Sequence, residues 1–351
     1  MNTTPRQPFF SAVLGNPHPG PSDPTQTMSA SLGFINNGNT ANHATRSALS
    51  VEVDGENPPS LRGIRRFAAS TEPLFDVMGA RLRMLNFAMA FFHTALFAVT
   101  IGVGNRDLSV PLWKPELEFV PRPQGTDGPA FQIVPSFVEA FDMPFTWLVA
   151  SFFAVSALAH LGNALIWRAF YERELAKCRV PTRWIEYFFS ATIMVVGLAY
   201  TTGIRSYLLL GCIGALIATT MLFGHLCELI ATPKSADEWE RPLSVRLQAH
   251  VLGYIPQVAA WTAILLNFFL APSAEEGQGP PDFVYLIVYL QVALFFSFGI
   301  VQLVQQYLPP KRYPAGEVAY QWLSLGAKGL LGGILLTNVL VLGSFEELFE
   351  E

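Results

Sequence analysis

The chain has 351 residues, of which 51% are hydrophobic and only 14% are charged, and its formal net charge is −5. Soluble domains usually carry about a quarter charged residues, so this composition excludes an ordinary soluble protein and indicates a membrane protein. The net charge says little about partners, because in a membrane protein the placement of charges matters more than their sum.

The first 70 or so residues are rich in Pro, Ser, Thr, Asn and Gly, with no apolar periodicity and no signal-peptide core. We therefore expect a disordered cytoplasmic extension over residues 1–78. An organelle transit peptide is the alternative, because acidic residues are scarce before Glu52, although arginines are scarce as well.

Seven apolar stretches are long enough to cross a bilayer, which takes about 20 helical residues. They lie at about 82–103, 145–167, 184–204, 207–230, 247–271, 282–307 and 316–343. The sequence therefore predicts an all-α membrane protein, with a bundle of seven transmembrane helices over 79–345 and an acidic extracellular tail at 346–351.

The segment between the first two helices, residues 104–143, contains short alternating runs such as "LEFV" and "FQIV", separated by Pro and Gly. Such alternation predicts a small β-structured extracellular loop. Its exposed strand edges can pair with a second copy, so we expect a homodimer. An irregular loop is the alternative.

Basic residues gather at one end of the predicted bundle. Those before the first helix and between the second and third are Arg62, Arg65, Arg66, Arg81, Arg83, Arg168, Arg173, Lys177, Arg179 and Arg183. The opposite end holds only Arg106, Lys114, Arg122 and Arg205. The positive-inside rule then places the N-terminus in the cytoplasm and the C-terminus outside the cell or in a lumen.

Of the 22 basic residues, we place only Lys328 deep in the hydrocarbon, within the seventh helix. A charge there costs at least about 2.5 kcal/mol, and neither membrane interface is within easy reach of its side chain. An amine desolvated in an apolar pocket is a good nucleophile toward an aldehyde and forms a Schiff base. Retinal is the aldehyde that suits seven helices, so Lys328 is the candidate attachment site and requires a nearby counter-ion.

Five polar residues are predicted at the height of Lys328, in the cytoplasmic half of the bundle: Glu186, His93, His160, Ser156 and Ser324. Glu186 is the candidate counter-ion. Each serine lies four residues before His160 or Lys328, and so shares its helical face. The alternatives are an interfacial position for Glu186 and ordinary interhelical hydrogen bonds for each histidine.

An apolar pocket is expected around the same height. Its candidate lining residues are Met194, Met221, Trp261, Phe295 and Phe298, for which packing against helices or lipid is equally plausible. Glu228, near the inner end of the fourth helix, is interpreted as a structural carboxylate at headgroup level.

Three segments carry a resemblance to a known family: "RWIEYFFSATIMV" opening the third helix, "MLFGHLCE" closing the fourth and "YQWLSLGAKGLL" on the seventh. Over roughly residues 80–345 the chain resembles the heliorhodopsins, retinal proteins of inverted orientation relative to the familiar microbial pumps. The resemblance implies a rhodopsin-like fold, covalent all-trans retinal on Lys328, Glu186 as counter-ion and a histidine and serine network around them. Gln302 stands where the family pattern leads us to expect an asparagine.

These features favour a light sensor, in which retinal isomerisation moves the Schiff-base proton to the Glu and His network and changes helix packing. A pump needs titratable groups on both sides of the Schiff base, whereas here they crowd the cytoplasmic half. A light-gated proton channel or light-driven proton transporter is the alternative, with Thr201, Thr202, Gln291 and Asn338 available. A third reading is a ligand receptor or scaffold without retinal.

The expected partners are retinal, the lipid bilayer, a second copy of the chain and a cytoplasmic signalling protein. We expect no enzymatic activity, no metal site and no nucleic-acid partner.

Overall fold

The structure is a computed structural model that describes residues 60–123, 128–231, 242–270, 280–308 and 312–341, and for 60–79 the backbone only. Residues Met1–Glu56 form a separate unit that lies outside this described part. The predicted tail at 346–351 lies outside it as well. The second unit is Asn57–Glu351 and contains the described residues.

Seven helices in the described residues are long and apolar enough to cross a membrane, and their spans begin and end within three residues of the predicted ones. The spans lie in α1 (Ser60–Val103), α2 (Phe145–Leu161), α4 (Pro181–Thr201), α5 (Tyr207–Ala231), α8 (Gln248–Leu270), α9 (Asp282–Tyr307) and α10 (Tyr313–Leu335). Two shorter helices, α3 (Arg168–Ala176) and α7 (Leu243–Arg246), are not membrane spans. Short π-helical segments, Gly162–Ile166 and Leu336–Leu340, extend α2 and α10. The prediction of a seven-helix membrane protein is confirmed.

The first helix differs from its prediction, because α1 begins at Ser60 rather than near residue 79. Residues 60–78 are therefore helical and not disordered. Leu61, Ile64 and Phe67 recur every three residues between arginines, a spacing that favours a helix but is too short and too charged to register as a membrane span.

Local sequence explains where several helices begin and end. Pro181 stands in the first turn of α4 and Pro314 in that of α10, where the missing backbone N–H costs nothing. Gly203 follows α4 with φ +95°, a left-handed conformation that ends a helix. The chain can then turn sharply into α5.

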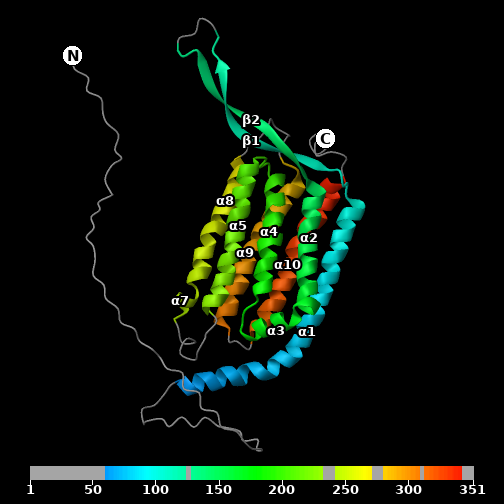
Figure 1. The fold of residues 1–351 in the computed structure, drawn as a ribbon, viewed down its shortest axis with the longest axis vertical. Helices are drawn as coiled ribbons and strands as arrows, with labels where there is room; N and C mark the ends of the chain where they lie inside the picture. The colour runs from blue at the N-terminus through cyan, green and yellow to red at the C-terminus, as the bar shows by residue number, and fades with distance from the viewer. Residues whose placement is uncertain (1–59, 124–127, 232–241, 271–279, 309–311, 342–351) are drawn as a thin grey trace, which may run out of the picture. The chain divides into compact units, whose positions relative to one another are not determined.

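The spans run alternately up and down in Figure 1, with α4 lying between α2 and α5, and α10 beside α9 and α1. By contrast, α8 and α9 approach each other closely at few positions. A hydrophobic core fills the bundle, and its largest fully buried side chains include Trp261, Tyr200 and Tyr320.

A β-hairpin crosses one end of the bundle (Figure 1). Strands β1 (Ser109–Pro121) and β2 (Phe131–Pro144) are antiparallel, with a register shift at Leu112/Trp113. Trp113 also bridges to Ser206, before α5. The β-structured loop predicted between the first two membrane helices is confirmed.

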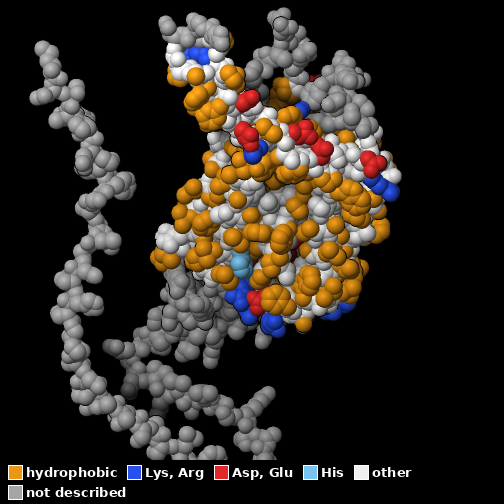
Figure 2. All heavy atoms as spheres, turned by 45° about the horizontal axis from the view of Figure 1, so that its top comes forward, with side chains coloured by type: hydrophobic (Ala, Val, Ile, Leu, Met, Phe, Trp, Pro, Cys, Tyr) orange, Lys and Arg blue, Asp and Glu red, His pale blue; other side chains and the backbone are white. Residues whose placement is uncertain are grey.

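The two ends of the bundle differ in charge, and Figure 2 shows hydrophobic side chains covering the face between them. We call the end opposite the hairpin the basic end; it carries Arg168, Arg173, Lys177, Arg179, Arg246 and Arg312. The hairpin end carries the acidic Asp107, Glu116, Glu118, Glu139 and Asp142 together with the basic Arg106, Lys114, Arg122 and Arg205. This is the charge pattern on which the predicted orientation rests.

Candidate functional site

The centre of the site is Lys328 on α10, whose residue is only 2% exposed. Its Nζ, a free amine standing for the nitrogen that would carry retinal, donates to Glu186 Oε1 at 2.7 Å and to Ser324 Oγ at 2.8 Å. It also lies 5.2 Å from the ring centroid of Tyr187. The buried charge thus has a carboxylate partner, as a buried ammonium requires.

Glu186 occupies the second turn of α4 and is 4% exposed, and its side chain bonds to residues of both α2 and α10. Its Oε1 also accepts a hydrogen bond from Ser156 Oγ of α2 at 2.7 Å. Its Oε2 lies 4.0 Å from His160 Nε2. The alternative of an interfacial carboxylate is therefore wrong.

The two histidines lie together beside this pair. The rings of His93 on α1 and His160 on α2 stack with centroids 5.7 Å apart and planes 4° apart. His160 Nδ1 lies 2.8 Å from Asn86 Oδ1. Neither nitrogen of His93 has a hydrogen-bond partner among the described residues. The five polar residues predicted near Lys328 are thus gathered around it.

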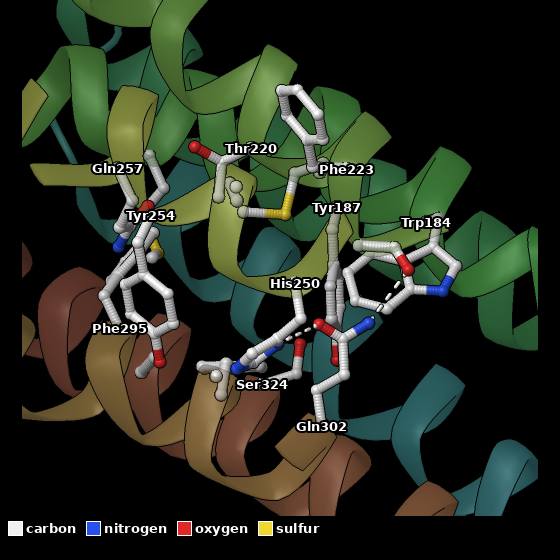
Figure 3. A pocket seen from close by; sticks show the side chains of 18 of the residues that line it. Trp184, Tyr187, Thr220, Phe223, His250, Tyr254, Gln257, Phe295, Gln302 and Ser324 are labelled. Carbon is white, nitrogen blue, oxygen red and sulfur yellow. Dashed lines mark hydrogen bonds between the residues drawn. The ribbon is translucent and has the colours of Figure 1, made fainter. Parts of the chain in front are cut away.

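A pocket of about 750 Å³ of empty space, its opening included, adjoins Lys328 and Ser324 between α4, α5, α8, α9 and α10 (Figure 3). Four of the five predicted lining residues do line it: Met194, Met221, Phe295 and Phe298. Trp261 does not. It is buried and its ring packs edge-on against that of Phe295, with ring centroids 5.4 Å apart.

Further lining residues were not predicted from the sequence. Trp184 and Tyr187 of α4 form an aromatic part of the pocket wall (Figure 3). His250 and Gln302 also line the pocket, with His250 Nδ1 2.9 Å from Gln302 Oε1. Gln302 Nε2 donates to Gly224 O at 2.8 Å, so this amide joins α5, α8 and α9. A largely apolar and aromatic pocket with one amine in its wall fits a retinoid aldehyde.

A second buried cluster lies between the site and the basic end. Arg183 of α4 donates to Glu228 of α5 and to Glu317 of α10, and its guanidinium lies 3.9 Å from the ring centroid of Tyr320. Tyr313 Oη donates to Glu228 at 2.8 Å. We refer to Arg183, Glu228, Glu317 and Tyr313 as the arginine cluster.

The arginine cluster bears on two sequence interpretations. The sequence predicts Arg183 in a loop, whereas it lies in the first turn of α4 and is buried. Glu228, interpreted as a structural carboxylate, forms a buried ion pair with Arg183. Glu317 was missed, although one signal could have revealed it. Glu317, Gln321, Ser324 and Lys328 recur every three or four residues and form one buried polar stripe along α10.

The chain is similar to one protein family and to solved structures. The sequence profile of the family described as Heliorhodopsin matches residues 82–340, which is most of the chain. Two solved structures are similar at 12% identity each. One is a cyanorhodopsin from the cyanobacterium Tolypothrix sp., with a TM-score of 0.48 over 74% of this chain and 93% of that one. The other is a light-driven proton pump from Leptosphaeria maculans, with a TM-score of 0.36 over 78% of this chain and 93% of that one. No curated protein matches the chain.

Proposed function

The chain belongs to the heliorhodopsin family and is therefore a retinal-binding rhodopsin and a multi-pass membrane protein, and from this premise we propose that it is a light sensor that does not pump ions. The observation that carries the proposal is the Lys328 and Glu186 pair, buried in the wall of an aromatic pocket. When bound covalently to Lys328 as the all-trans isomer, retinal supplies visible absorption and light-driven isomerisation.

The residues around Lys328 hold a proton at Nζ in the dark. Glu186 Oε1 faces Nζ at 2.7 Å, so its charge favours the protonated nitrogen. Ser156 Oγ donates to Glu186, and Ser324 Oγ accepts from Lys328 Nζ. The two hydroxyls therefore orient the pair. After illumination the proton leaves Nζ for the Glu186 carboxylate and passes from it to the neighbouring His160, and the change of charge alters how α2, α4 and α10 pack.

The distribution of titratable groups supports sensing over pumping. From Lys328 toward the basic end, the buried groups include Glu186, His160, Glu317 and Glu228. Toward the hairpin end, the buried polar residues in the described ranges are uncharged, such as Thr100, Thr146, Ser190, Thr202 and Gln291, without Asp, Glu or His. A pump needs donor and acceptor groups on both sides, so the one-sided arrangement favours a sensor.

The alternative of a light-gated proton channel or light-driven proton transporter has less support. The four hydroxyls and amides named for a proton path donate to backbone carbonyls, and Asn338 Nδ2 also donates to Thr337 Oγ1 at 2.9 Å. Thr201 bonds to Leu198 O, Thr202 to Ala199 O, Asn338 to Ile334 O and Gln291 to Ala327 O.

Orientation and partners complete the proposal. The basic end faces the cytoplasm by the positive-inside rule, so the N-terminus is cytoplasmic and a signalling protein would dock at that end. The hairpin faces the other side, and its exposed Leu117, Phe119, Phe131 and Ile133 would pair with a second copy in a homodimer.

Photocurrent measurement tests the proposal. The full chain, expressed with all-trans retinal in a voltage-clamped cell, should show a visible absorption band and no light-induced current, because no titratable path reaches the hairpin end. A proton pump recorded in the same cells gives the size of a positive signal. A steady current dependent on the pH gradient would replace the sensor with a channel, and one against the gradient would replace it with a transporter.

Replacing the counter-ion gives a spectral prediction. Glu186→Gln should shift the visible band to longer wavelength, or cause it to be lost at lower pH than in the wild type, because the cation at Nζ loses its compensating charge. Absorption spectra recorded across a pH titration measure both effects. Glu186→Asp keeps the charge and should restore most of the wild-type behaviour.

The matched control is Glu174→Gln, which removes another buried carboxylate that bonds Lys177 Nζ at 2.8 Å outside the membrane spans. It should leave the spectrum unchanged. A Glu186→Gln spectrum and titration identical to the wild type would assign the counter-ion to another residue.

A further inference from the structure

We propose that Asn86 is a positioning residue that fixes the tautomer of His160, with hydrogen on Nδ1, so that Nε2 is the atom that accepts the proton from the Lys328 and Glu186 pair. The light-driven part rests on the proposed function. The tautomer itself is a property of the protein in the dark and can be measured independently.

The direction of the Asn86 amide follows from its partners. Asn86 is fully buried in α1, and its Nδ2 donates to Leu82 O at 3.0 Å while its Oδ1 lies 2.8 Å from His160 Nδ1. Turning the amide over would place Oδ1 against the Leu82 carbonyl, two acceptors facing each other in a dry interior. Oδ1 therefore faces the histidine, and because it can only accept, Nδ1 must carry the hydrogen.

The consequence appears at the other ring nitrogen. A neutral histidine with hydrogen on Nδ1 has a free lone pair on Nε2. His160 Nε2 is buried, has no hydrogen-bond partner among the described residues and lies 4.0 Å from Glu186 Oε2. This separation is too long for a hydrogen bond but suits an ion pair once Nε2 is protonated.

The proton step balances without any further reactant. The N–H bond at Lys328 Nζ breaks, the proton passes by way of the Glu186 carboxylate, and an N–H bond forms at His160 Nε2. The resulting imidazolium keeps both hydrogens partnered, Nδ1–H with Asn86 and Nε2–H toward Glu186. With hydrogen on Nε2 instead, His160 would present a donor to Glu186 and could accept nothing there.

The decisive experiment uses the full chain in lipid bilayers with all-trans retinal, labelled with ¹⁵N-histidine and measured in the dark by solid-state NMR. The His160 signals are assigned by their loss in His160→Gln. The wild type should show a protonated Nδ1 and an unprotonated Nε2. Asn86→Leu, which cannot accept, should give a mixture of tautomers or the reverse one, whereas Asn86→Asp should retain hydrogen on Nδ1.

A kinetic readout accompanies the spectrum. After a flash, loss of the proton from Lys328 Nζ, followed as the blue-shifted species, should slow at least about tenfold in Asn86→Leu, because a histidine in the wrong tautomer has no acceptor nitrogen in place. Asn86→Asp should rescue the rate. The matched control is Asn163→Leu, which removes another buried asparagine, bonded to Trp167 Nε1 at 2.8 Å, and should change neither readout.

Hydrogen on Nε2 in the wild type would overturn the inference, as would an unchanged tautomer in Asn86→Leu. Should Asn86→Leu not fold, Asn86→Ala serves in its place, and the wild-type spectrum alone can still contradict the assignment. A protein that stays colourless with retinal would refute the proposed function, yet its ¹⁵N spectrum would still report the tautomer.

Discussion

Lys328→Ala is expected to abolish the visible pigment completely. The described membrane spans offer no other lysine, and Lys328 Nζ is the amine in the wall of the aromatic pocket. Without it no covalent bond to retinal forms and no charged nitrogen is present to shift absorption into the visible. The measurement is an absorption spectrum of purified protein after incubation with all-trans retinal.

The control for this variant must separate attachment from folding. Removing Lys328 leaves Glu186 as a buried carboxylate without its cation, which is itself destabilising. The double variant Lys328→Ala, Glu186→Gln removes both charges and should fold while remaining colourless. Lys177→Ala, at an exposed lysine of the basic end, should keep full colour. A visible band that persists in the double variant would refute the attachment site.

Arg183→Met should destabilise the protein by about 3–5 kcal/mol, the cost of breaking a buried ion pair from one side. It leaves Glu228 and Glu317 buried close together without a cation, although Glu228 keeps hydrogen bonds from Tyr313 Oη and from Val180 N at 2.9 Å. Because the cluster ties α4, α5 and α10 together, the loss should spread through the bundle. Denaturant unfolding in mild detergent, followed by tryptophan fluorescence, measures it.

A graded series guards against a variant that does not fold. Glu317→Gln leaves the Arg183 and Glu228 pair intact and should cost much less than Arg183→Met. The triple variant Arg183→Met, Glu228→Gln, Glu317→Gln has no buried charge and should recover part of the stability. Arg173→Met, at a mostly exposed arginine, is the matched control. If Arg183→Met were as stable as this control, the cluster would contribute nothing to stability.

Hydropathy along the chain was sufficient for the architecture. Apolar runs of membrane length are local features, so each span could be predicted to within three residues. The cost of burying a charge singled out Lys328, and helical spacing placed Ser324 on its face. The bond between their side chains, at 2.8 Å, follows directly from that spacing.

Tertiary structure alone decided how the helices stand against one another. Depth counted from each helix end leaves open how the helix ends stand relative to one another, and the structure pairs Arg183 of the first turn of α4 with Glu317 of the second turn of α10. Arg183 is helical because α4 begins at Pro181, before the predicted start at residue 184.

The sequence by itself determined the seven helices, the hairpin, the charged ends and the amine that requires a counter-ion. Only the tertiary structure decided which polar groups meet, such as Asn86 with His160. The reason is physical. Periodicity records the face that a helix buries, whereas the height and rotation of each helix relative to its neighbours arise from packing between segments far apart in the chain.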